Sequence, residues 1–134
     1  NHFLIDSRWH LVDLPGYGYA SVSKKTKNEF KKIIYAFFLK RLQLVNTFLL
    51  IDIRHSPQQN DIDFMNWLGI NHIPFSIVFT KADKISHVQS KKLVNKYFNF
   101  LIENYWDELP PYFVTSSKSK EGRKELISYI KKFI

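Results

Sequence analysis

The chain has 134 residues, of which 45% are hydrophobic, 16% are aromatic and none is cysteine. This apolar content excludes a disordered tail, and the lack of cysteine excludes disulfides, thiol nucleophiles and cysteine-based metal sites. No apolar run approaches the roughly 18 residues of a membrane span and no signal-peptide pattern opens the chain, so we expect a soluble, intracellular protein of one domain, residues 1–134. The net charge of +8 favours a polyanionic partner, most commonly nucleic acid.

The N-terminal part predicts two strands, an irregular loop and a helix. Residues 2–5 and 9–12 form an antiparallel pair around a turn, and residues 14–23 are irregular because they contain proline and two glycines. From about residue 25 to 41, apolar side chains recur at helical spacing with lysines on the other face. The apolar face of this amphipathic helix is formed by Phe30, Ile33, Ile34, Phe37 and Phe38.

The rest of the chain alternates apolar strands with helices. Residues 48–53 and 75–79 are too short for core helices and predict strands covered on both faces, and residues 112–114 predict a third strand. Such alternation predicts a mostly parallel sheet flanked by helices, in which ligands bind at the carboxyl ends of the strands.

Three helices are predicted between and after these strands. The first covers residues 61–68 and ends at Gly69, a residue typical of helix termini. The second begins with a capping box of Ser86 and Gln89 and reaches about Leu101. The last presents one apolar face, formed by Leu126, Ile127, Ile130 and Phe133.

Asp13 and Gly16 are candidates for a metal and phosphate site. Asp13 ends a predicted strand, and the Gly16 amide, three residues on, has no side chain that blocks an anion. A carboxylate so placed would hold Mg²⁺, and the glycine amide would meet the terminal phosphate of a nucleotide. The same Asp-x-x-Gly spacing also occurs in ordinary turns.

Two later loops are candidates for binding a guanine base. In Thr80-Lys81-Ala82-Asp83, the Asp83 carboxylate would accept two hydrogen bonds from guanine while the Lys81 stem lies along the purine. In the loop Thr115-Ser116-Ser117-Lys118, a backbone N–H, that of Ser117 in our interpretation, would meet the guanine carbonyl oxygen. Each loop alone equally fits a solvated turn, and the weight comes from their order along the chain.

Taken together, these motifs resemble the translation-factor-like P-loop GTPases. The run from Val12 to Ala20, with its Pro-Gly-Tyr-Gly-Tyr-Ala, is similar to the EngB (YihA/YsxC) family of bacterial GTP-binding proteins, as are residues 52–55 and Gly122. The resemblance covers essentially the whole chain. It implies a Ras-like α/β fold, GTP or GDP with Mg²⁺ as cofactors, and a cytoplasmic protein that assists assembly of the large ribosomal subunit and is linked to cell division and septum formation.

The chain departs from the family pattern in two ways. It contains no Gly-x-x-x-x-Gly-Lys-Ser/Thr phosphate loop, so it resembles the C-terminal two thirds of the domain, without the first strand, the first helix and the first switch. We expect such a piece to be unstable or to aggregate alone, and the intact protein to be a monomer. Tyr17 replaces the water-orienting Gln of many GTPases, which implies slow hydrolysis by the intact protein and leaves the catalytic residue unknown. Because the piece lacks the phosphate loop, we expect it to be inactive by itself.

The sequence is compatible with a polyanionic partner and with two alternative functions. The lysines near the tyrosine-rich loop favour ribosomal RNA or the large ribosomal subunit as partner rather than a membrane, although any single lysine fits a solvated helix face slightly better. A phosphoacceptor receiver domain would use Asp13, Asp52, Thr80 and Lys81, but it needs its Thr and Lys on different strands. A nucleotide-independent RNA-binding module is the third possibility, supported by charge alone.

Overall fold

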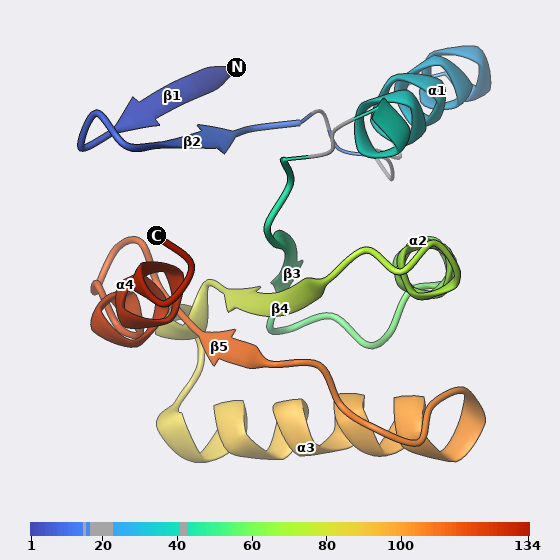
Figure 1. Ribbon diagram of the computed structural model, residues 1–134. Coiled ribbons are helices and arrows are strands. Elements are labelled where there is room, and N and C mark those ends of the chain that lie inside the picture. The colour runs from blue at the N-terminus through green and yellow to red at the C-terminus, as the bar shows by residue number, and fades with distance from the viewer. Residues whose placement is uncertain (15, 17–22, 41–42) are drawn as a thin grey trace. The chain divides into compact units, whose positions relative to one another are not determined.

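The computed structural model describes residues 1–14, 16, 23–40 and 43–134 (Figure 1). The chain forms two compact units, one of residues 1–45 with Ile134 and the other of residues 46–133. Each unit contains its own sheet, a two-stranded one in the first and a three-stranded one in the second. The prediction of one domain for residues 1–134 stays a prediction.

The first unit begins with the predicted antiparallel hairpin. Strands β1 (His2–Ile5) and β2 (Trp9–Val12) pair in register from His2 opposite Val12 to Ile5 opposite Trp9. Asp6 and Ser7 both have positive φ, at 50° and 53°, as the tight turns that suit twisted hairpins require. The predicted strand bounds are therefore confirmed.

Helix α1 (Lys24–Lys40) follows in the same unit and confirms the predicted amphipathic helix over the described residues. Its first turn is capped by Ser23, whose Oγ accepts a hydrogen bond from the Thr26 N–H at 3.1 Å. Ile34 and Phe38 are buried, but Ile33 is 55% exposed. The five residues of the predicted apolar face therefore differ in burial, although they lie on a helix as predicted.

The second unit is built on a parallel sheet in the order β3 (Thr47–Asp52), β4 (Phe75–Thr80) and β5 (Tyr112–Val114). Asp52 lies opposite Thr80, so the carboxyl ends of β3 and β4 are level. This arrangement confirms the predicted strands within a residue at each end and the predicted parallel sheet. Its helices are α2 (Gln59–Ile70), α3 (His87–Asn104) and α4 (Arg123–Lys131), with a short 3-10 turn, η1 (Ala82–Lys84).

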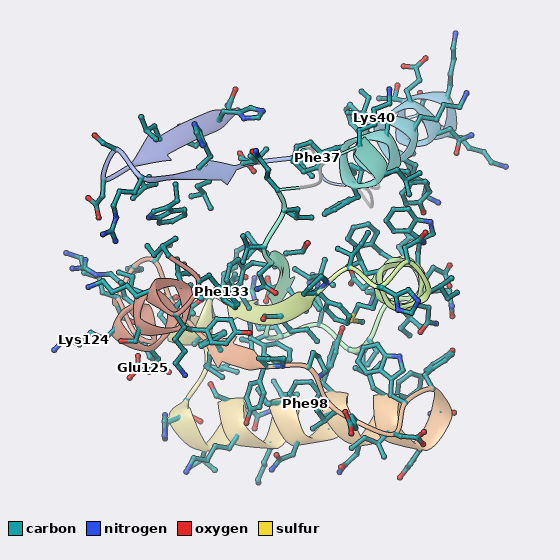
Figure 2. All side chains as sticks on the ribbon, in the orientation of Figure 1. Phe37, Lys40, Phe98, Lys124, Glu125 and Phe133 are labelled. Carbon is teal, nitrogen blue, oxygen red and sulfur yellow. The ribbon has the colours of Figure 1, made fainter. Side chains whose placement is uncertain are left out.

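Helices cover both faces of the three-stranded sheet. On one face the Phe79 ring packs edge-on against Tyr97 and Phe98 of α3, at centroid distances of 5.3 and 5.7 Å. Figure 2 shows Phe98 pointing from α3 toward the sheet. On the other face, Tyr129 of α4 packs against Phe48 and Phe113. These aromatic contacts make the core that holds the strand ends in place.

Strand β4 is buried on both faces as predicted, but β3 is not. Residues 76 to 79 of β4 are all at most 3% exposed, whereas Leu50 of β3 is 65% exposed between the buried Leu49 and Ile51. The prediction that both faces of β3 are covered is therefore wrong. The reason is that β3 has one strand neighbour, β4, among the described residues, and the Tyr129 ring of α4 contacts β3 at Phe48, two residues before Leu50.

Two helix ends differ from the prediction. Helix α2 runs through Gly69 to Ile70 and is closed by His72, which adopts φ of 57° while its N–H donates to the Gly69 carbonyl. The Ile73 N–H donates to the Leu68 carbonyl at 2.9 Å, which completes a Schellman motif. Gly69 is thus not the terminator. Helix α3 starts at the predicted cap, where Ser86 Oγ accepts from the Gln89 N–H at 3.1 Å, but continues to Asn104.

The last helix, α4, differs in its buried face. Ile127 and Phe133 are 44% and 40% exposed, and no residue of α4 is fully buried. These two residues of the predicted apolar face are therefore exposed, and Phe133 lies beyond the end of α4 at Lys131. Tyr129 makes the contacts with the sheet instead, because its ring reaches Phe113 and its hydroxyl accepts a long hydrogen bond of 3.4 Å from Ser76 Oγ.

Candidate functional site

The eight predicted site residues divide between the two units. Asp13 and Gly16 lie in the first unit, and the six residues of the two base-binding loops lie in the second. Tyr17 lies outside the described residues. The second unit therefore carries six of the eight, which are Thr80, Lys81, Asp83, Ser116, Ser117 and Lys118.

Asp13 follows β2 and has an exposed side chain. Its backbone extends the hairpin, because its N–H donates to the Asn1 carbonyl at 2.9 Å and its carbonyl accepts from the Asn1 amino group at 3.0 Å. The backbone is thus fixed while the carboxylate projects beyond the strand end. Within the described part of the chain, no group of three His, Asp or Glu side chains could hold a metal ion. One carboxylate nevertheless fits Mg²⁺, which commonly keeps several waters and shares substrate phosphates.

The loop after β4 turns sharply at Lys81. Lys81 adopts φ of 63° and ψ of 33°, a left-handed conformation that turns the chain directly into η1. The Ala82 N–H donates to the Thr115 carbonyl at 3.0 Å, and Ala82 is only 4% exposed. This backbone bond joins the loops that follow β4 and β5, so the two predicted base-binding motifs lie side by side.

A side-chain hydrogen bond also joins the loops that follow β4 and β5. The Ser116 hydroxyl is buried, at 2% exposure for the residue, and donates to Asp83 Oδ1 at 2.7 Å. The same Ser116 Oγ accepts from the Ser119 N–H at 3.0 Å. This hydrogen bond, more than the nearby charges of Lys84 and Lys118, holds the pKa of Asp83 below its usual range. Asp83 is therefore ionised at neutral pH, and its exposed carboxylate remains open to solvent.

The loop after β5 is closed by Gly122. The Ser116 N–H donates to the Glu121 carbonyl at 3.1 Å, which makes a tight loop from residue 116 to 121. Gly122 adopts φ of 77°, and a Cβ placed there would lie 2.1 Å from the Val114 carbonyl oxygen. Only glycine fits this closure. Ser117 and Lys118 are exposed on the same loop.

Thr80 is the predicted site residue whose side chain has a different role. Its Oγ1 donates a long hydrogen bond of 3.4 Å to the Ile51 carbonyl of the neighbouring strand. The Thr80 side chain therefore bridges β3 and β4, and its contribution to the loop is the position of its backbone.

Asp52 and Arg54 lie next to the site but were not among its predicted residues, and Asp52 received a role from the sequence only in the receiver-domain alternative. The Asp52 carboxylate ends β3 and accepts three hydrogen bonds from Arg54, from the backbone N–H and Nε at 3.0 Å and from Nη2 at 2.7 Å. Asp52 Oδ2 also lies 3.6 Å from Lys81 Nζ. The hydrogen bond from the Arg54 side chain, reinforced by its backbone N–H and its charge, lowers the pKa of Asp52. A charged residue that ends an otherwise apolar strand was the available signal.

None of the helices that the structure describes is long and apolar enough to cross a bilayer. This finding matches the sequence, in which no apolar run has the length of a span.

A parallel sheet between helices, with a carboxylate and a serine loop at adjacent strand ends, is the α/β architecture of the P-loop GTPases. In a comparison with solved structures, the chain matches translation elongation factor SelB from Methanococcus maripaludis in its apo form, with a TM-score of 0.66 at 18% identity. The match covers 90% of this chain and 24% of SelB. The fold is thus that of a P-loop GTPase, as predicted. No family model matches the chain.

The curated relatives are more similar. The chain is 55% identical over 130 residues to a protein named Probable GTP-binding protein EngB of Phocaeicola vulgatus, and 54% identical to one of the same name from Christiangramia forsetii. A third EngB protein, from Porphyromonas gingivalis, is 52% identical. Each match covers 97% of this chain, whereas the chain spans 64 to 65% of the length of these relatives. These matches confirm the resemblance to the EngB family.

Proposed function

We propose that this chain carries the guanine-binding part of an EngB-type GTPase. The observation that supports the proposal is the junction of the two loops, in which Ser116 donates to Asp83 Oδ1 and Ala82 donates to the Thr115 carbonyl. A carboxylate held ionised and exposed beside a buried serine presents acceptors to the N1–H and exocyclic amine of guanine. Adenine has no such pair of donors on that edge.

The remaining site residues have complementary roles in this proposal. The aliphatic stem of Lys81 lies along the purine ring, and the backbone of Ser117 meets the guanine carbonyl oxygen. Lys118 and the Thr80 backbone border the base. Asp13 holds Mg²⁺, directly or through water, and the Gly16 amide meets the terminal phosphate of GTP. The metal supplies charge neutralisation at the phosphates when it is bound.

We further propose that the whole protein hydrolyses GTP slowly and acts in the cytoplasm as a monomer on the large ribosomal subunit, with links to cell division and septation. The support is the EngB name of the relatives and the charge of α1. That helix carries six lysines, four of them exposed, which would neutralise phosphates of ribosomal RNA. They are Lys24, Lys25, Lys27, Lys31, Lys32 and Lys40.

The receiver-domain alternative has a specific obstacle. A phosphoacceptor aspartate needs a free nucleophilic oxygen, but both oxygens of Asp52 accept hydrogen bonds from Arg54. The Thr80 hydroxyl points to the Ile51 carbonyl rather than to a phosphoryl site. These contacts leave the guanine-binding proposal as the better explanation of the strand ends.

The test is an exchange of base specificity in the full-length protein. Asp83→Asn should move nucleotide preference from guanine toward xanthine, because the amide presents donors where the carboxylate presents acceptors. Affinities for GDP and XDP are measured by titration calorimetry, with Asp6→Asn as the matched control at an exposed hairpin turn. Guanine selectivity that survives Asp83→Asn unaltered would contradict the assignment.

A further inference from the structure

A shallow groove lies at the opposite end of the sheet from the base-binding loops. It has a volume of about 870 Å³ and is lined by the C-terminal end of α2, the start of β4 and the loop from α3 to β5. In Figure 1 this loop lies on the α2 side of the sheet. Its apolar wall includes Ile70, which is 77% exposed, and Leu109, which is 41% exposed. Exposed aliphatic side chains around a groove are typical of a protein-binding surface.

The groove is preformed by packed aromatic residues. Trp106 Nε1 donates to Asn66 Oδ1 at 3.0 Å, and the Trp106 ring packs against Phe75 at a centroid distance of 6.0 Å. Gly69 forms part of the lining, and a Cβ placed there would meet no atom within 4 Å. Little ordering is therefore needed before a ligand side chain enters the groove.

The charge around the groove is opposite to that of the rest of the chain. Residues 65–75 and 106–110, which supply both walls, contain two of the 12 acidic residues and none of the 20 lysines and arginines. These two acids, Asp107 and Glu108, are exposed, as is Glu103 near the end of α3. In a chain of net charge +8, this segregation gives the groove an acidic rim that repels nucleic acid and attracts cations.

We propose that this groove binds a basic segment of a partner protein, rich in lysine or arginine and carrying aliphatic side chains that fill the groove. The aliphatic groups contact Ile70, Leu109 and the open surface at Gly69, while the cations pair with the acidic rim. The groove and the base-binding loops lie at the two ends of β4, roughly 16 Å apart for a six-residue strand. Partner binding is therefore separate from nucleotide binding.

The test uses the full-length protein and a fluorescently labelled peptide of alternating lysine and leucine, followed by anisotropy. Gly69→Lys should weaken binding by about tenfold or more, because it places a cation in the groove, and Glu108→Lys should weaken it similarly. The matched controls are Gly69→Ala, which adds only a methyl group, and Glu125→Lys on the exposed surface of α4 in Figure 2. Both controls should bind within about twofold of the parent protein.

Three results would overturn the proposal. The first is equal peptide affinity of Gly69→Lys and Gly69→Ala, or equal peptide affinity of Glu108→Lys and Glu125→Lys. The second is equally tight binding of a peptide of lysine alone, which would show that charge acts without the groove. The third is a dimer that Gly69→Lys converts to a monomer in sedimentation, which would make a second copy the occupant. GDP affinity measured on each variant should stay unchanged, and this keeps the test independent of the guanine site.

Discussion

Gly122 is the residue whose replacement most directly tests the geometry of the base-binding loops. It follows Glu121, whose carbonyl accepts the Ser116 N–H, and it precedes the first turn of α4. Substitution by alanine adds one methyl group, which would lie 2.1 Å from the Val114 carbonyl oxygen and 3.0 Å from Thr115 Cγ2. Such an approach to a backbone atom is relieved only by moving the loop.

The expected loss of stability follows from three costs. Alanine in the left-handed region costs about 1 kcal/mol relative to glycine. Relief of the overlap with Val114 resembles overpacking of a core and costs about 1–3 kcal/mol. Opening the loop also weakens the hydrogen bond from Ser116 to Glu121, with a net value of about 1 kcal/mol. We therefore expect Gly122→Ala to lower the free energy of unfolding by about 3–5 kcal/mol.

Urea unfolding of the full-length protein measures this loss, and GDP titration measures its effect on the site. Because the loop that moves carries Ser116 and through it Asp83, GDP affinity should fall by at least about tenfold. The matched control is Gly69→Ala, which should raise the free energy of unfolding by about 0.5–1 kcal/mol, since Gly69 lies inside α2 with open space around it. Equal effects of the two substitutions, or a neutral Gly122→Ala, would refute the reasoning.

Three further predictions concern single groups. Tyr97→Phe should leave the free energy of unfolding unchanged or raise it by up to about 1 kcal/mol in urea, because the buried hydroxyl has no hydrogen-bond partner among the described residues; a clear loss would contradict this. Arg54→Met should return the pKa of Asp52 toward its ordinary 3.8 in a carboxyl NMR titration. In the parent protein, ionised Asp52 adds to the free energy of unfolding above that pH and the contribution is lost as the pH falls, and in Arg54→Met this contribution should disappear. Ser116→Ala should likewise raise the pKa of Asp83, whereas an unchanged value would assign the shift to nearby lysines.

Much of the fold was predictable because the strands have simple sequence signals. Apolar runs of five or six residues between polar loops located β3 and β4 within a residue at each end, and a run of three residues located β5. The end of α2 was not predictable in this way, because Gly69 supplied a terminator signal while the chain used His72 in a left-handed conformation. The carbonyls of Gly69 and Leu68 accept hydrogen bonds from the N–H groups of His72 and Ile73, and these bonds fix where α2 ends. The preferences of single residues carry no information about such bonds.

The proximity of the two proposed base-binding loops was predictable from the order of their motifs. Parallel neighbours end at the same edge of a sheet, so loops after β4 and β5 must lie close together, as the contact of Asp83 with Ser116 demonstrates. The left-handed conformation of Lys81 and the loop closure at Gly122 could not be predicted from the sequence. Both depend on how closely two backbone segments approach, Ala82 to Thr115 in one case and Gly122 to Val114 in the other.

The same rule of strand ends could have identified Asp52 and Arg54, and it explains why they matter. Asp52 lies opposite Thr80, directly before Lys81, so the charge that ends β3 must approach the lysine that follows β4. Arg54 fixes the Asp52 carboxylate with hydrogen bonds from both its backbone and its guanidinium group. Asp52 Oδ2 lies 3.6 Å from Nζ of Lys81, whose aliphatic stem is proposed to cover the purine. The loop after β4 is thus connected to both of its neighbours, to the loop after β3 by this ion pair and to the loop after β5 by the hydrogen bond from Ser116 to Asp83.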